Sequence, residues 1–136
     1  MSALSTMLRR LIRRSDGVAA IEFAIILPVM AALMGGIFEG GRLMWVRNSI
    51  QSATEQAVRL AMVNPAATDL ELEAEASDYF DGIGGGSPSF SVARDTVDAV
   101  DFVTVNGSYE FQSILSLVDF GLVTLRGKAR VPLETL

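Results

Sequence analysis

The chain has 136 residues, of which 11 are basic and 16 acidic, giving a net charge of −5, and it contains neither cysteine nor histidine. These missing residue types exclude disulfides, thiol nucleophiles, the usual zinc sites and any Ser-His-Asp triad, so we expect no metal and no other cofactor. The strongly basic cluster flanks an apolar stretch, so neither nucleic acid nor a small-molecule substrate is expected as a partner.

The chain begins with a basic leader, residues 1–17, followed by an apolar stretch, residues 18–38. The leader holds one acidic residue, Asp16, and its basic residues are Arg9, Arg10, Arg13 and Arg14. A helix over 18–38 would be about 30 Å long, which matches the thickness of a bilayer core. Under the positive-inside rule the leader stays in the cytoplasm and the acidic remainder lies across the membrane. We therefore expect a single-pass membrane protein with a cytoplasmic N-terminus.

One carboxylate, Glu22, lies inside the apolar stretch. An acid at mid-membrane costs about 2.5–3.5 kcal/mol, so it usually has a partner or a role. A plain signal anchor would also explain it, because Glu22 lies only about 6 Å of helix rise from Val18 and can reach the polar interface. An ordinary cleaved secretory signal fits less well, since the apolar run exceeds the roughly 7–15 residues of such signals.

A more specific pattern surrounds Glu22. It reads Gly17-Val18-Ala19-Ala20-Ile21-Glu22-Phe23. This string resembles the processing site of type IV prepilin-like proteins, where a membrane peptidase cuts after a glycine and leaves glutamate as the fifth residue of the product. The wider region, about residues 13–62, holds the strings Arg13 to Ala24, Leu27-Pro28, Phe38-Glu39-Gly40-Gly41-Arg42 and Ala53 to Arg59. Together these strings resemble the TadE-like family of tight-adherence pilus proteins.

The resemblance implies a minor pilin or pseudopilin of the tight-adherence (Flp) pilus that is not an enzyme and that serves adherence and biofilm formation. It implies the bacterial inner membrane with a periplasmic C-terminal domain, and leaves open whether the chain enters the pilus. The implied partners are the lipid bilayer, a prepilin peptidase, major and minor pilin subunits and inner-membrane pilus assembly proteins. Cleavage would fall between Gly17 and Val18, and Glu22 with Phe23 would serve subunit assembly.

The physical logic of this site is a charge pair between subunits. Cutting after Gly17 removes the leader arginines and creates an α-amine on Val18 that is mostly cationic at neutral pH. When helices pack lengthwise, Glu22 of one subunit can meet the amine of a neighbour, which sets axial register more than it adds stability.

Small residues recur at every fourth position of the span, with a proline in the gap, and would let helices approach closely. The positions are Ala20, Ala24, Pro28, Ala32, Gly36 and Gly40. Such residues are also common in any membrane helix. Pro28 should loosen or kink the helix, because it cannot donate to the Ala24 carbonyl.

Beyond the span the helical pattern continues to about Val63 and ends at Asn64-Pro65. One apolar stripe predicts either a packing face for the following domain or a coiled-coil seam. The stripe consists of Leu43, Val46, Ile50, Ala53, Ala57 and Leu60. Arg42, Trp45 and Arg47 suit the outer membrane interface, where tryptophan is enriched.

A capping-box pattern, Thr68 with Glu71, opens a second helix to about Phe80, and its inward residues would be Leu72, Ala76, Tyr79 and Phe80. Its dense acidic run could bind calcium or a basic partner, but it lacks EF-hand spacing and suits a solvated face. The run consists of Asp69, Glu71, Glu73, Glu75, Asp78 and Asp81.

The remainder predicts β structure: a short strand over 89–93, a long strand around 103–111 and a last strand over 123–131. Asn106-Gly107 alone would signal a hairpin, but unbroken alternation favours one strand, with a bulge at Gly107 as a further option. Gln112 to Gly121 would be an apolar-rich connection. The last strand carries a basic row, Arg126, Lys128 and Arg130, that suits solvent, a partner or an acidic glycan.

The predicted fold class is therefore α+β, with a long membrane-spanning N-terminal helix that extends into the periplasm and packs on a small antiparallel β-sheet in a pilin-like plan. The predicted parts are the leader 1–17, the span 18–38, the helix extension 39–63 and a small α+β domain 64–136. Two other classes stay open: an uncleaved, membrane-anchored binding or scaffold protein, and a tethered hydrolase using paired carboxylates such as Asp98 and Asp101.

Overall fold

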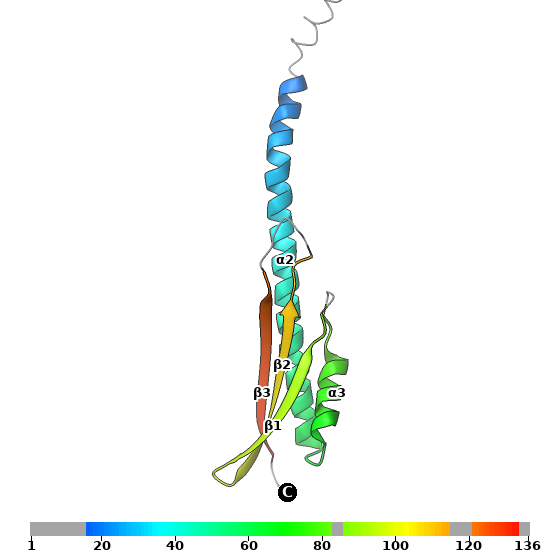
Figure 1. Cartoon of the computed structure of the whole chain (residues 1–136), viewed down its shortest axis with the longest axis vertical. Coiled ribbons are helices and arrows are strands. Elements are labelled where there is room, and N and C mark those ends of the chain that lie inside the picture. The colour runs from blue at the N-terminus through cyan, green and yellow to red at the C-terminus, as the bar shows by residue number, and fades with distance from the viewer. Residues whose placement is uncertain (1–15, 83–85, 115–120, 134–136) are drawn as a thin grey trace, which may run out of the picture.

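A computed structural model describes residues 16–82, 86–114 and 121–133 of the chain (Figure 1). Its elements are the helices α2 (Asp16–Val63) and α3 (Asp69–Tyr79) and the strands β1 (Ser89–Val97), β2 (Val100–Phe111) and β3 (Val123–Leu133). The sheet and α3 pack against the C-terminal half of α2, and the N-terminal half of α2 projects beyond them (Figure 1). The predicted α+β plan, a long helix on a small antiparallel sheet, is confirmed.

Two predictions fall on parts of the chain outside the described residues. The four leader arginines, Arg9, Arg10, Arg13 and Arg14, all precede residue 16. Most of the apolar connection between β2 and β3, residues 115–120, is likewise outside the description.

Helix α2 confirms the prediction of one continuous rod. Its 48 residues run through Pro28 without interruption, so the missing N–H of this proline does not end the helix. At the C-terminal end, Asn64 N–H still donates to the Leu60 carbonyl at 2.8 Å, and Pro65 follows. Because the described helix starts at Asp16, Gly17 lies in a helical turn and not in an extended junction.

The apolar stripe on α2 is the packing face for the sheet. Val46, Ile50, Ala53 and Ala57 are all fully buried. Val46 and Ile50 belong to one core cluster with residues of β2 and β3, and Ala57 belongs to a second with residues of β2 and α3. Near the C-terminal end of the stripe, Ala57 shares a core cluster with Ala61 of the same helix and with Leu72 of α3. Of the two readings left open by the sequence, domain packing is therefore the one that the structure shows.

The sheet has the order β1-β2-β3 with both pairs antiparallel. Strand β1 runs to Val97, four residues farther than predicted, because the turn to β2 falls at Asp98-Ala99. Both turn residues have positive φ, 52° and 65°, as a two-residue type I′ hairpin requires. Strand β2 is one unbroken strand, as the alternation predicted.

No bulge occurs at Gly107, because this residue pairs in regular register with Phe90 on β1 and with Gly127 on β3. Close approach of α2 explains the two glycines instead. A Cβ on Gly127 would lie 2.9 Å from the Ile50 carbonyl oxygen, and one on Gly107 would lie 2.9 Å from Ile50 Cγ1. The helix therefore crosses the sheet closely at Ile50, where both β2 and β3 carry a glycine and have no side chain in the way.

Helix α3 begins with the predicted capping box. The Glu71 N–H donates to Thr68 Oγ1 at 3.3 Å, and the Thr68 N–H donates to Glu71 Oε2 at 2.8 Å. Leu72 and Ala76 are fully buried as expected, but Tyr79 is 53% exposed, so its predicted inward position is wrong. The inward row steps by four residues, from 72 through 76 to Phe80, which leaves Tyr79 beside it. Phe80 packs between the Phe90 and Tyr109 rings.

Candidate functional site

The projecting half of α2, residues 17–38, is an apolar rod whose side chains are almost all exposed with respect to the described part of the domain (Figure 1). Within the described part of the chain, α2 from Gly17 to Val63 is the helix long and apolar enough to cross a membrane. An isolated apolar surface of this size is not stable in water and indicates burial in lipid or against other chains. Its exposed large side chains are Val18, Ile21, Phe23, Ile25, Ile26, Leu27, Val29, Met30, Leu33, Met34, Ile37 and Phe38.

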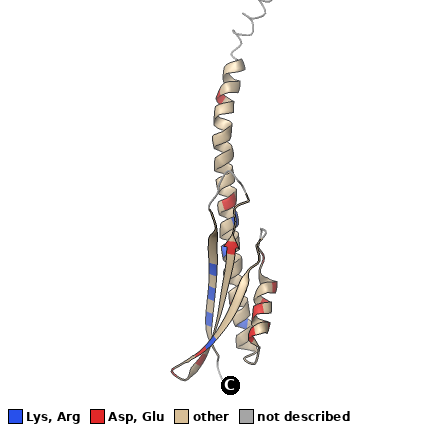
Figure 2. Ribbon diagram, viewed as in Figure 1, with Lys and Arg blue, Asp and Glu red and all other residues tan. Residues whose placement is uncertain are grey.

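The predicted processing and assembly residues all lie at the free end of this rod. Gly17 and Val18 belong to the helix, and Glu22 and Phe23 follow about one turn later, both exposed. Val18 and Glu22 are four residues apart, so they lie on the same helix face. Figure 2 shows how little charge the projecting half carries, and Glu22 is its one carboxylate. Cleavage at Gly17-Val18 and the assembly role of Glu22 stay predictions.

The predicted row of small residues follows a ridge inclined to the helix axis. A step of four residues advances about 40° around the helix, so the row winds partly around the rod. Its first four positions, Ala20, Ala24, Pro28 and Ala32, are exposed, and Gly36 and Gly40 are half-buried. A Cβ on either glycine would meet no atom within 4 Å. Among the described residues, the first four positions of this ridge are therefore left uncovered by the domain.

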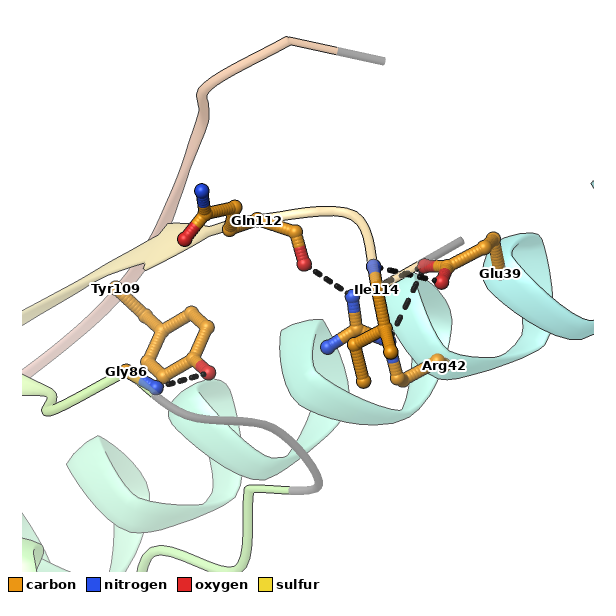
Figure 3. A network of polar contacts seen from close by, with 6 residues as sticks. All are labelled: Glu39, Arg42, Gly86, Tyr109, Gln112 and Ile114. Carbon is orange, nitrogen blue, oxygen red and sulfur yellow. Dashed lines mark hydrogen bonds and ion pairs between the residues drawn. The ribbon is translucent and has the colours of Figure 1, made fainter. Parts of the chain in front are cut away.

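A buried ion pair lies where the projecting half meets the domain (Figure 3). Glu39 is 0% and Arg42 5% exposed, and Arg42 Nη2 lies 2.9 Å from Glu39 Oε2. Arg42 Nε donates to the same oxygen at 3.2 Å. Both residues come from one face of α2, since they are three positions apart. We call this pair, with the two backbone groups described next, the clamp.

The clamp fastens the segment that follows β2 to the helix (Figure 3). The Ile114 N–H donates to Glu39 Oε1 at 3.0 Å, and Arg42 Nη2 donates to the Gln112 carbonyl. The Arg42 guanidinium also stacks over the Phe111 ring, 4.0 Å from its centroid. A carboxylate and a guanidinium taken out of water are tolerable only with such partners.

Arg42 is buried under the segment after β2, so its guanidinium serves the domain, and its predicted place at the outer membrane interface stays a prediction. Its burial was missed because its partners stand about 70 residues away, although the spacing of Glu39 and Arg42 was a visible signal. Trp45, by contrast, is 52% exposed, and its indole N–H donates to the Asp81 carbonyl at 3.1 Å. Its membrane-interface role stays a prediction.

The charged residues of the domain are mostly exposed. Arg94 pairs with Asp69 at 2.7 Å, which ties β1 to the start of α3. Hydrogen bonds from the Thr68 backbone N–H, and then from its hydroxyl, lower the pKa of Glu71 below the ordinary 4.5. No group of three or more His, Cys, Asp or Glu able to hold a metal occurs among the residues described.

These features define a class of protein: a small α+β domain with one long helix, whose N-terminal half projects from the domain and exposes a continuous apolar surface. Comparison with family models then gives a match over residues 17–59 to the family described as TadE-like protein. The match covers the projecting half, the clamp residues on α2 and most of the stripe, and it confirms the TadE-like resemblance. The matched residues include most of the helix that is long and apolar enough to cross a membrane. Comparison with curated proteins and with solved structures gives no match.

Proposed function

We propose that the chain is a minor pilin or pseudopilin of the tight-adherence pilus, inserted in the bacterial inner membrane with its leader in the cytoplasm. A prepilin peptidase cuts between Gly17 and Val18, and the product assembles with pilin subunits and the inner-membrane assembly proteins. Adherence and biofilm formation are the processes served. The observation that carries the proposal is the division of α2 into one half buried under its own domain and one apolar half left bare.

The projecting half of α2 suits two environments, first the membrane and then the assembly. In the membrane its large apolar side chains face lipid, and Glu22 can reach the polar interface because it lies near the helix end. In an assembly the same surface faces neighbouring helices, and Glu22 can pair with the α-amine of Val18 on another subunit. The pair lowers the desolvation cost of both charges. It also fixes the axial offset between neighbouring helices, which an ordered assembly requires.

N-terminal sequencing of protein extracted from membranes, with and without the prepilin peptidase, tests the processing step. The expected result is a chain that starts at Val18 when the peptidase is present and keeps its leader when it is absent. A functional protein that retains the leader in the presence of the peptidase would contradict the proposal. That result would favour the alternative, an uncleaved, membrane-anchored scaffold protein.

The variant Glu22→Ala tests the assembly step. We expect normal insertion and cleavage but no incorporation into the pilus complex, as measured by co-purification with other pilus subunits. Glu55→Ala is the matched control, because Glu55 is an exposed carboxylate on the same helix within the domain half. Normal co-purification of the Glu22 variant would refute the pairing role.

A further inference from the structure

The outer face of the sheet, opposite α2, divides into a filled part and a hollow part. Near the β1–β2 hairpin, Arg130 stacks on Phe102 with 4.3 Å to the ring centroid and pairs with Asp95 at 2.5 Å. Farther along the strands the outward side chains of β1 and β2 are short, and a depression of about 460 Å³ lies between them and the longer outward side chains of β3. Its outward lining residues are Ser89, Ser91, Asn106, Ser108, Arg126 and Lys128.

The depression is formed by strand register and not by a loop. Ser89, Ser108 and Arg126 lie side by side across the three strands. The next row on the same face, toward the β1–β2 hairpin, is Ser91, Asn106 and Lys128. The Gln51 side chain holds β3 against α2 here, because it accepts from the Lys128 N–H and donates to the Lys128 carbonyl, both at 3.2 Å. Strand β3 is therefore fixed by its pairing with β2 on one edge and by the Gln51 side chain on the other.

The polar groups in the depression have spare capacity for a ligand. The Ser89 and Ser108 hydroxyls bond to each other at 2.7 Å, and each still has a further lone pair. Among the residues that the structure describes, neither Arg126 nor Lys128 forms a salt bridge, and both are exposed. Figure 2 shows the basic residues following one another along β3. Two unpaired cations and four neutral hydroxyl or amide side chains thus share one hollow.

We propose that this depression binds a carboxylated sugar segment of an anionic polysaccharide. Arg126 and Lys128 bind the carboxylates through charge-assisted hydrogen bonds, and the serines and Asn106 bond to the sugar hydroxyls. Alternating residues on one strand are about 7 Å apart, so the two cations reach neighbouring charges along a chain. The inference stands on the sheet alone and goes beyond the proposed role in pilus assembly.

The lining chemistry favours a sugar over a macromolecule of another class. The buried centres of protein–protein interfaces are enriched in apolar and aromatic side chains, and the lining of this depression contains neither. Single-stranded nucleic acids need aromatic platforms for their bases, which the lining also lacks. Without an aromatic ring beneath the sugar, binding by one chain is weak and gains strength where several copies bind one polymer.

Binding of hexagalacturonate to the full-length chain in phosphatidylcholine nanodiscs, at low and at physiological salt, tests the proposal. Arg126→Gln/Lys128→Gln should weaken binding at least tenfold. Arg47→Gln/Arg59→Gln removes the same charge from exposed positions on α2 and should leave binding within twofold. Equal affinity of the first pair and the wild type, or equal loss in both pairs, would overturn the site.

A third variant separates a shaped sugar site from simple attraction between charges. Ser91→Leu fills the hollow, keeps both cations and places a residue that a strand tolerates at an exposed edge. It should weaken hexagalacturonate binding at least fivefold, with unchanged circular dichroism. If Ser91→Leu binds like the wild type and polyglutamate competes equally well, the sugar assignment is wrong. If no probe binds but the Arg126/Lys128 pair is needed for self-association in sedimentation, the face contacts a second copy and the proposal fails.

Discussion

Removing one side of the clamp should loosen the domain from its helix. In Glu39→Ala, the Ile114 N–H and the Arg42 guanidinium lose a fully buried carboxylate that now accepts from both. Breaking a buried ion pair by removing one partner costs about 3–5 kcal/mol, because the remaining charge stays desolvated. We therefore expect Glu39→Ala to lower the free energy of unfolding of the domain by about that amount. Insertion of the apolar half should be unaffected.

The assay is denaturant unfolding of the full-length chain in micelles, followed by the fluorescence of its single tryptophan. Trp45 lies about one helical turn from Arg42 and bonds to the segment after α3, so it reports separation of the domain from α2. Glu110→Ala, which removes an exposed carboxylate from β2, is the matched control and should change stability by no more than about 0.5 kcal/mol.

A double-mutant cycle identifies the pair as the cause. The cycle consists of Glu39→Leu, Arg42→Met and the double variant Glu39→Leu/Arg42→Met, which removes both buried charges and should cost less than Glu39→Leu alone. Additive effects of the two single changes, or a loss below about 1 kcal/mol in Glu39→Ala, would refute the reasoning.

Three further outcomes follow from the domain. Gly127→Ala should destabilise it by about 1–3 kcal/mol, because the new Cβ would lie 2.9 Å from the Ile50 backbone oxygen; unchanged thermal unfolding would contradict this. Ala99→Gly should stabilise it by about 1 kcal/mol, since glycine adopts positive φ without strain, and the midpoint of denaturant unfolding should rise. The lowered pKa of Glu71 gives stability that is complete above pH 4.5 and is lost as pH falls below it through the folded-state pKa. Thr68→Ala should remove this acid-sensitive part of the unfolding profile, and an unchanged profile would argue against the capping box as its source.

The elements that sequence predicted well depend on local or periodic signals. The helix from 16 to 63, the capping box of α3 and the alternation along β2 each follow from patterns within a few residues of one another. The hairpin at Asp98-Ala99 was missed because its second residue is alanine, whereas glycine or asparagine usually marks positive φ. The exposed side of Tyr79 was missed because one helical step decides between core and solvent.

The candidate site was predictable in one half only. The apolar span and Glu22 are visible in the sequence, because lipid acts on every side of the helix and demands a continuous apolar run. The clamp as a whole was not predictable, because Glu39 and Arg42 bond to backbone groups of Gln112 and Ile114. Only the folded chain brings these groups near the helix. The glycines at 107 and 127 are likewise explained by the close approach of Ile50, which lies far away in sequence.

The clamp also determines how the proposed assembly contact would reach the domain. Helix α2 is unbroken between Glu22 and Glu39, which are about 25 Å apart by helix rise. If neighbouring helices are set in register at Glu22, the domains follow that register only when each is fastened to its own helix. Glu39 supplies such a fastening between the rod and the segment after β2. Loss of Glu22 should therefore abolish co-purification while leaving the domain stable, whereas loss of Glu39 should destabilise the domain first. Equal stability losses in the two variants would mean that the charges do not act separately.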